Sequence, residues 1–186
     1  MNLILASNSP RRKQILKNNG YNFIVIPSNY EENISNKPYS SDIVKNCAKN
    51  KAKAILNKTN KNSIIISADT VVVSDNIILG KPKDKSDAIK MLNNLSGKTH
   101  FVATAVCLIN TKTNKVLTEI DTTEVTFRKL QNEDILKYLE NSKPYDKAGS
   151  YGIQDENFDF CTNINGELDN VIGFPIKLFN TMLLTI

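Results

Sequence analysis

The sequence predicts an α/β protein in which helices cover a mixed sheet. Two observations predict this fold class. Strand-like and amphipathic helical segments alternate through the first half of the chain, and two long strand-like segments, 101–109 and 116–127, follow each other across a short polar turn. Strands joined by so short a turn are expected to be antiparallel. Because 186 residues suit one hydrophobic core, we expect a single domain over residues 1–186.

The first predicted strand, residues 3–6, turns through small polar residues into a basic amphipathic segment. Ser9 is a favoured N-cap residue, and Pro10 suits the first position of a helix. The unpaired amides at such a helix N-terminus attract anions, and Arg11 and Arg12 add positive charge beside them. The turn is therefore either a phosphate site or an ordinary helix start with basic surface residues.

A short strand is expected over residues 23–27, followed by a polar loop. The next helix is expected to be capped by Ser40 or Ser41 and to end near residues 57–62. Apolar residues recur through it at helical spacing, namely Ile43, Val44, Cys47, Ala48, Ile55 and Leu56. Its lysines, Lys51 among them, are expected to face solvent.

The β-branched run 63–68 is typical of a strand buried on both faces, and Asp69 and Thr70 follow it. Residues 71–73 and 77–79 predict a hairpin. The remaining expected elements are a helix over 85–95 with Gly97 as its stop, a helix over 133–141, a loop over 142–154, a turn at Asn165-Gly166 and a last helix from Pro175.

Composition and cysteine count exclude several classes of protein. No apolar run approaches the roughly 20 residues of a membrane helix, and the first residues lack an export signal, so we expect a cytoplasmic protein. Three widely spaced cysteines and one histidine, His100, fit neither a disulfide framework, nor a zinc site, nor Ser/His hydrolysis. We expect His100 to be structural or exposed. The net charge of +5 suits polyanions, yet the scattered lysines are typical of solvated surface.

Several polar residues lie where a purely structural role does not require them. Asp69 follows a buried strand, where open α/β sheets place ligands, and it could hold a cation or accept a proton from water. Lys81 lies in a rigid Gly-Lys-Pro corner, and Glu32 lies in a loop. The loop 148–154 contains two glycines, an aromatic residue and Gln154, whose amide can read the edge of a base. Singly, each residue could be a turn cap or a solvated side chain; together they match a nucleoside triphosphate hydrolase.

The sequence resembles the Maf family of nucleotide pyrophosphatases from Leu5 to about Pro175. The motifs that carry the resemblance occur in the family's order: LASNSPRR, EEN, AKNKA, SADT, GKPKD, LSGKTH, DKAGSYGIQ and GFP. Three of these motifs, SPRR, ADT and AGSYGIQ, resemble those of the family branch that acts on dTTP and UTP. The branch that acts on 7-methyl-GTP differs at these places. The resemblance implies an inosine triphosphatase-like fold with a cleft. It also implies cleavage of these or modified pyrimidine nucleotides to a nucleoside monophosphate and pyrophosphate.

The same resemblance implies roles for nine residues. Asp69 corresponds to the family's proton acceptor, and the substrate-specificity positions are Arg11, Thr70 and Gln154. We expect catalysis from Asp69, Glu32, Lys51 and Lys81, substrate binding from Ser7, Arg11, Arg12, Thr70 and Gln154, and metal binding from Asp69 and Glu32. The expected cofactor is a divalent cation, Mg²⁺ or Mn²⁺, and the family implies frequent homodimers.

One segment departs from the family pattern. After Gln154 the family usually continues with glycines, whereas this chain has Asp155 and Asn157. Two positions that suit a positive φ therefore carry side chains, and a negative charge is expected beside the base pocket. This departure bears on base preference more than on phosphate chemistry.

Two other classes of function remain open from the residues. A nucleotidyltransferase also begins with a strand and a phosphate-binding loop, although that loop is usually glycine-rich and this chain has no glycine before Gly20. The alternative without enzymatic activity is a regulator of septum formation and cell division, or a nucleic-acid-binding protein. Nucleic-acid binding that weakens steeply with salt, without any release of pyrophosphate, would support this alternative.

Overall fold

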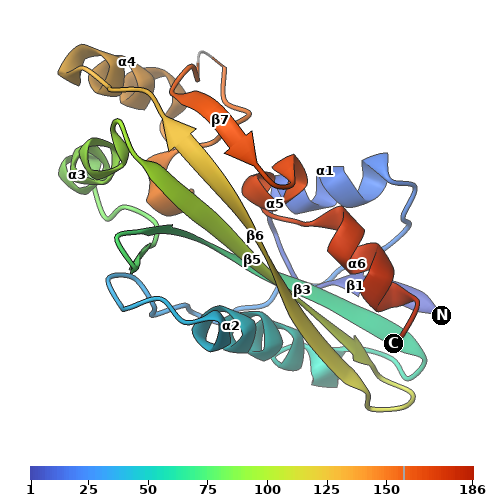
Figure 1. Ribbon diagram of the computed structural model, residues 1–186. Coiled ribbons are helices and arrows are strands. Elements are labelled where there is room, and N and C mark those ends of the chain that lie inside the picture. The colour runs from blue at the N-terminus through green and yellow to red at the C-terminus, as the bar shows by residue number, and fades with distance from the viewer. Residues whose placement is uncertain (157) are drawn as a thin grey trace.

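Three strands of twelve residues each form the centre of the sheet: β3 (Ser63–Ser74), β5 (Thr99–Asn110) and β6 (Val116–Phe127). The computed structural model describes residues 1–156 and 158–186. β5 is antiparallel to both of its neighbours, β3 and β6 (Figure 1). The parallel strands β1 (Asn2–Leu5) and β2 (Ile24–Val25) extend one side, and β7 (Cys161–Asn165) pairs with β6 on the other. The predicted mixed sheet is confirmed, with the order β2-β1-β3-β5-β6-β7.

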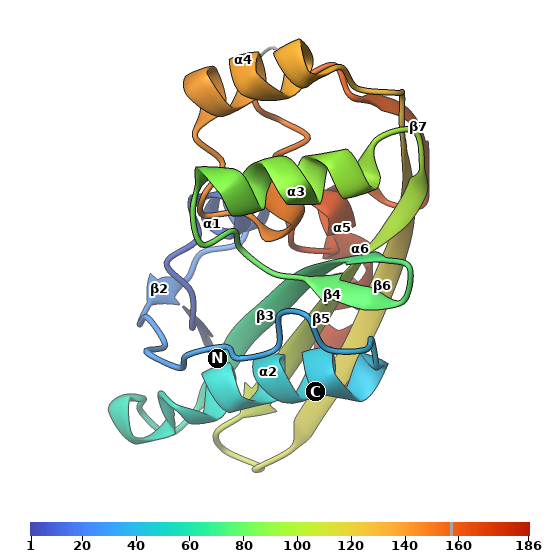
Figure 2. The same cartoon turned by 90° about the vertical axis from the view of Figure 1, so that its left-hand side faces the viewer.

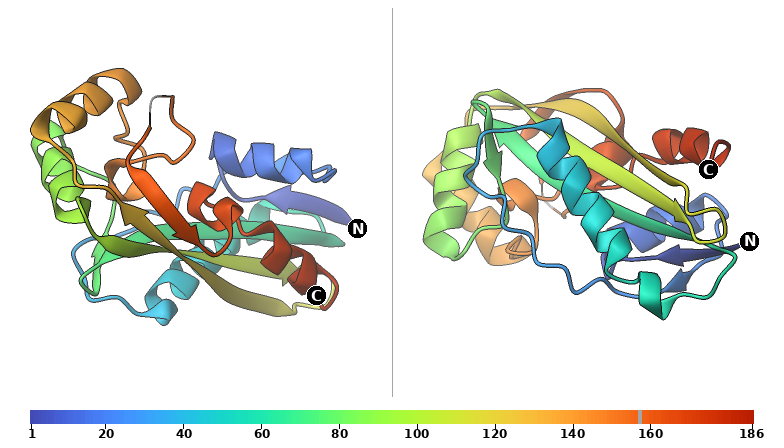
Figure 3. Two further views of the ribbon diagram at one scale, coloured as in Figure 1. Left: turned by 45° about the horizontal axis from the view of Figure 1, so that its top comes forward. Right: turned by 90° about the horizontal axis from the view of Figure 1, so that it is seen from below.

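Helices cover both faces of this sheet. α2 (Ser41–Lys53) packs on one face, and α1 (Pro10–Asn18) and α6 (Ile176–Leu183) pack on the other (Figures 1 and 3). α3 (Lys85–Leu95) and α4 (Asn132–Ser142) lie together at one end of the long strands (Figure 2). The short elements are η1 (Leu56–Lys58), β4 (Ile77–Leu79), η2 (Ala148–Ser150) and α5 (Leu168–Ile172).

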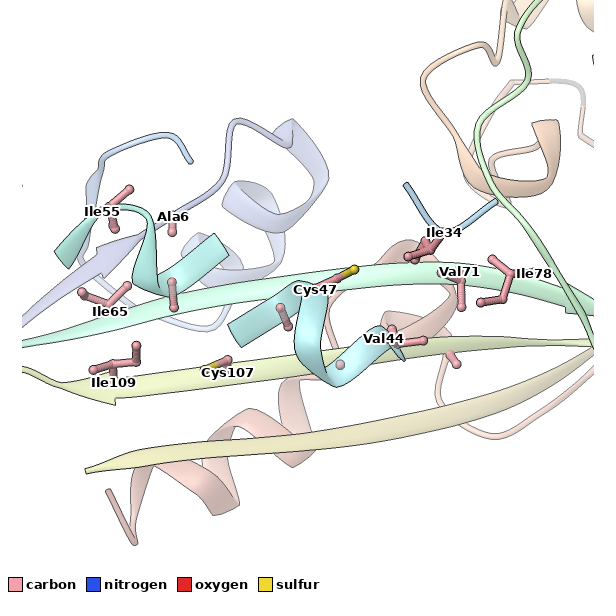
Figure 4. Packing of buried hydrophobic residues seen from close by; sticks show 14 of the residues in the cluster. Ala6, Ile34, Val44, Cys47, Ile55, Ile65, Val71, Ile78, Cys107 and Ile109 are labelled. Atoms are coloured by element: carbon pink, nitrogen blue, oxygen red, sulfur yellow. The ribbon is translucent and has the colours of Figure 1, made fainter. Parts of the chain in front are cut away.

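The β-branched run of β3 is buried on both faces of the sheet, as its composition predicts. Because side chains alternate along a strand, Ile65 joins the apolar cluster between the sheet and α2, where it lies near Ile55 and Ile109, as Figure 4 shows. Ile64 and Ile66 join the core on the opposite face. The middle of the sheet therefore separates two apolar layers.

Helix boundaries that depend on local capping agree with the prediction. The Ser9 side chain accepts a hydrogen bond from the Arg12 amide, and Pro10 begins α1. The Ser40 hydroxyl accepts from the Asp42 amide, so α2 begins at Ser41. The predicted end of α2 at residues 57–62 is wrong: α2 ends at Lys53, because a 3₁₀ turn, η1, follows it.

The main error in the prediction concerns β3. We expected a strand to end before Asp69 and a separate hairpin strand to begin at residue 71, but β3 is continuous through Asp69 and Thr70. It continues because β5 pairs with it from Ile64 to Val73. The hairpin itself is confirmed, since β4 pairs with the end of β3 and the turn residues Asp75 and Asn76 both have positive φ. β7 and α5 were not predicted.

His100 is a structural residue, 3% exposed, with Nε2 2.8 Å from the Tyr151 hydroxyl. Burial lowers its pKa from 6.5 to about 4. Between pH 6.5 and about 4, His100 binds a proton in the unfolded chain but not in the folded protein. The free energy of unfolding therefore decreases as the pH falls through this range. We expect wild type to lose up to about 3 kcal/mol of unfolding free energy, relative to His100→Gln, from neutral pH to about pH 4. Urea unfolding of both proteins measures this, and a difference that does not change with pH would contradict it.

Candidate active site

Asp69 lies in the middle of β3, where one side of the strand has no neighbour. β1 pairs with β3 only as far as Ile66, because the chain leaves the sheet after Leu5, and β4 pairs only from Val72. In the described part of the chain, residues 67–71 of β3 pair with β5 alone. A cleft of about 780 Å³ lies at this gap.

The structure brings all nine residues predicted for the site to the lining of this cleft. They are Ser7, Arg11, Arg12, Glu32, Lys51, Asp69, Thr70, Lys81 and Gln154. They come from the β1–α1 turn, the first turn of α1, the loop before α2, α2 itself, β3, the segment after β4 and the loop after η2. Lys81 and Gln154 are exposed at the cleft, whereas Asp69 and Lys51 are buried.

A lysine held between two carboxylates forms the centre of the cleft. Lys51 Nζ lies 2.5 Å from Asp69 Oδ1 and also pairs with Glu32. Asp69 is 1% exposed and Lys51 is 8% exposed. The Ser67 hydroxyl donates to the Ala48 carbonyl at 2.6 Å, which ties α2 to β3 close to this pair. The expectation that Lys51 faces solvent is therefore wrong, because its carboxylate partners lie inward.

The two carboxylates have different affinities for protons. Burial raises the pKa of Asp69 to about 6, although Lys51 opposes the shift. Burial also acts to raise the pKa of Glu32, but Lys51, Lys81 and Arg12 together outweigh it and lower that pKa below its ordinary value. Asp69 Oδ2 is buried and has no hydrogen-bond partner among the described residues. Asp69 is therefore the carboxylate better suited to exchange a proton near neutral pH.

Arg12 forms the cationic wall of the cleft. Its guanidinium donates to the Gly173 carbonyl at 3.0 Å, the Thr70 hydroxyl at 3.1 Å and the Ser7 hydroxyl at 3.3 Å. These three partners are neutral, so none of them neutralises its charge. Burial lowers the pKa of Arg12, while Asp69 and Glu32 oppose that shift, and a guanidinium in a protein stays charged. The arrangement suits the oxygens of a phosphate group.

The loop that carries Gln154 is anchored to the sheet by a glycine. Gly149 has a φ of 66°, and its amide donates to the Gly80 carbonyl at 3.0 Å. A Cβ at this position would lie 2.9 Å from the Val72 side chain. Gly149 is therefore required by close packing on β3. At the rim of the same loop, Arg11 pairs with Asp146 at 3.1 Å.

Sequence reasoning missed several residues that shape the cleft. Asp146 holds Arg11, Thr104 shares a hydrogen bond with the Thr70 hydroxyl at 3.0 Å, and Gly173 offers its carbonyl to Arg12. Two of them lie inside the quoted motifs DKAGSYGIQ and GFP, which were the available signal. Thr104 lies within an apolar strand and gives no signal of its own.

The negative charge expected beside the base pocket is present, since Asp155 lines the cleft, but other side chains contact it. The Tyr138 hydroxyl donates to Asp155 Oδ2 at 2.6 Å, and Lys147 Nζ lies 3.6 Å from the same oxygen. Asp155 does not have a positive φ, so the expected backbone strain is absent at this residue. Asn157 lies outside the described residues.

A mixed sheet with a polar gap at its centre, a half-buried arginine on one wall and a lysine between two carboxylates defines an α/β protein with a cleft for a polyanionic ligand. The chain belongs to the Maf family: the family model described as Maf-like protein matches residues 2–186. Among residues 1–156 and 158–186, no helix is both long and apolar enough to cross a membrane.

Two curated relatives are similar to the chain over nearly its whole length. A protein of Clostridium perfringens (strain 13 / Type A), named dTTP/UTP pyrophosphatase, is 45% identical over 184 residues, which cover 98% of this chain and 96% of that protein. A protein of the same name from Thermoanaerobacter sp. (strain X514) is 41% identical over 183 residues, which cover 98% and 95%.

Two solved structures share the fold. A HAM1 protein from Coxiella burnetii aligns over 100% of both chains with a TM-score of 0.52, and the Staphylococcus aureus Ham1 protein aligns over 100% of this chain and 99% of its own with a TM-score of 0.53. Each is 13% identical to this chain, so the likeness concerns the fold alone. The expected architecture, a mixed sheet covered by helices, is confirmed and is shared with these two structures.

Proposed function

We propose that the protein hydrolyses dTTP and UTP between the α and β phosphates, releasing the nucleoside monophosphate and pyrophosphate. The observation that carries this proposal is the buried Asp69, whose Oδ2 has no partner among the described residues, in a cleft that also contains Arg12 and Lys51. Further support comes from the 41–45% identical relatives that bear the name dTTP/UTP pyrophosphatase.

In the proposed reaction, Asp69 accepts a proton from the attacking water. The water oxygen forms a bond to the α-phosphorus, and the bond from that phosphorus to the bridging oxygen breaks. Pyrophosphate leaves with the electron pair of the broken bond. Arg12 and Lys81 act on the charge that develops on this leaving group, because preorganised cations in a cleft stabilise such charge. Lys51 holds the Asp69 carboxylate in place through its 2.5 Å contact.

A divalent cation fits this cleft, although the described residues contain no group of three or more His, Cys, Asp or Glu side chains placed to hold one. Mg²⁺ commonly uses only one or two protein carboxylates together with substrate phosphates. Asp69, through its unpartnered Oδ2, and Glu32 are the residues that would hold the ion. When bound, Mg²⁺ or Mn²⁺ supplies charge neutralisation at the phosphate oxygens.

Recognition of the nucleotide is assigned to the rim of the cleft. Gln154 is exposed there and offers both a donor and an acceptor to the edge of a base. Thr70 and Arg11 line the same cleft. Residues 148–154 carry no charged side chain, which suits an uncharged pyrimidine.

Incubation with a panel of canonical and modified nucleoside triphosphates tests the reaction and the position of cleavage. We expect dTTP and UTP to be the preferred substrates and to give the monophosphate and pyrophosphate in equal amounts. Chromatography of the nucleotide products and a pyrophosphate assay measure this. A diphosphate with orthophosphate would contradict the cleavage position. Formation of a nucleotide sugar when a sugar phosphate is added would indicate a nucleotidyltransferase instead.

A further inference from the structure

A single tyrosine hydroxyl joins both ends of the turn that carries Gln154. The Asp155 amide donates to the Gly152 carbonyl at 2.9 Å, so residues 152–155 form a β-turn with Ile153 and Gln154 at its centre. The Gly152 amide donates to Tyr138 Oη at 2.9 Å, and Tyr138 Oη donates to Asp155 Oδ2 at 2.6 Å. Tyr138 therefore contacts the first and the last residue of the turn.

Tyr138 is itself held by the core. It projects from α4 and is 4% exposed, with its ring 5.1 Å from Phe160 and 5.8 Å from Phe158 in edge-on contacts. Burial and the bond to Asp155 raise the pKa of its phenol, so the hydroxyl remains a donor. A buried ring fixed by aromatic neighbours gives the turn a rigid support.

The support extends through charged residues to Arg11 in α1, which also lines the cleft. Lys147 Nζ lies 3.6 Å from Asp155 Oδ2 and 3.0 Å from Asp146 Oδ1, and Asp146 Oδ2 lies 3.1 Å from Arg11 Nη1. A chain of contacts thus runs from Asp155, the residue after Gln154, to Arg11 on α1. Gln154 and Arg11 are two of the proposed specificity residues.

We propose that Tyr138 and Asp155 are positioning residues that fix the direction of Gln154 and thereby set the preference for the base. The proposal rests on the proposed function. Neither side chain needs to touch the nucleotide, because each acts through the 152–155 turn. In this chain, Asp155 provides by a side-chain bond the restraint that a glycine at that position could not provide.

Tyr138→Phe removes the hydroxyl and keeps the buried ring. We expect it to raise the KM for UTP about 10-fold, with little change in kcat, and to reduce the preference for UTP over ATP by a similar factor. Asp155→Ala is expected to do the same, and the double variant to be no worse than either single one. Asp155→Asn keeps an acceptor for the tyrosine and should stay close to wild type. Tyr145→Phe, the same change at an exposed tyrosine, is the control and should have no effect.

Amide hydrogen exchange provides a readout that is independent of turnover. We expect the Gly152 amide to exchange faster in Tyr138→Phe than in wild type, because its acceptor is gone.

A lower kcat with an unchanged base preference, additive effects in the double variant, or unchanged Gly152 exchange would overturn the proposal. If Tyr138→Phe does not fold, Asp155→Ala carries the same prediction. If the wild-type protein cleaves no triphosphate, both the proposed function and the role of Tyr138 and Asp155 in base choice are refuted. The exchange of the Gly152 amide would still show whether Tyr138 restrains the 152–155 turn.

Discussion

Replacing Asp69 by asparagine is expected to lower kcat for UTP roughly 10²- to 10⁴-fold, the range in which a general base contributes to catalysis. Asparagine has nearly the same shape and can still accept a hydrogen bond from Lys51, so the fold should be retained. It cannot accept a proton from water. The measurement is steady-state pyrophosphate release, with thermal unfolding of both proteins to verify that the variant is folded.

The matched control for this change is Asp75→Asn, which makes the same substitution in the exposed turn between β3 and β4. Asp75 does not line the cleft, so its variant should turn over UTP at the wild-type rate. The pH profile gives a second check. Because Asp69 must be ionised to accept a proton, wild-type activity should fall on the acid side, at or below about pH 6, since a bound cation would favour the carboxylate. Near-normal turnover by Asp69→Asn would remove Asp69 from the role of proton acceptor.

The parts of the fold that could be predicted are those that local chemistry determines. Ser9 and Pro10 specify the start of α1, and Asp75-Asn76 specifies the hairpin, because capping and positive φ depend on neighbouring residues alone. The helix over 85–95 was predicted to the residue, because Ala88, Met91, Leu92 and Leu95 show its inner face directly in the sequence.

The parts that could not be predicted depend on distant partners. β3 runs through Asp69 and Thr70 because β5 pairs with it along its length, and two polar residues in a strand have no local signature that distinguishes them from a turn. Lys51 has the spacing of a solvated helix lysine, and only the carboxylate on β3 shows why it is buried. The strand pairing and the salt bridge are both contacts between segments far apart in the sequence.

The candidate site was located by resemblance and then refined by geometry. The family motifs brought nine residues together, and all nine line one cleft. Motifs cannot show that Gly173 offers its carbonyl to Arg12, or that the Tyr138 hydroxyl donates a hydrogen bond to the Asp155 carboxylate. One contact uses a backbone carbonyl and the other uses a side chain outside the motifs. The order of residue types in the sequence therefore does not reveal either contact.

Replacing Lys51 by methionine is expected to lower the free energy of unfolding by about 3–5 kcal/mol at neutral pH, because it leaves the buried Asp69 carboxylate without its counter-charge. Methionine fills a similar volume, so packing on β3 is largely kept. The loss should become smaller as the pH falls from neutral towards about 6, because Asp69 without Lys51 takes up its proton at a higher pH than in wild type, and it should level off below about 6, where Asp69 is protonated in both proteins. Urea unfolding over a pH series measures both effects.

The same helix offers a control for that variant. Lys45 also pairs with a carboxylate, Glu119, at 3.2 Å, but both side chains are substantially exposed, so Lys45→Met should cost less than about 1 kcal/mol. The double variant Lys51→Met/Asp69→Asn should recover part of the stability lost in Lys51→Met, because no buried charge is then left unpaired. Equal losses in Lys51→Met and Lys45→Met, or no recovery in the double variant, would show that the charge pair does not stabilise the centre of the cleft. The expected result would instead identify Lys51 as the residue that makes a buried, ionised Asp69 compatible with the folded protein.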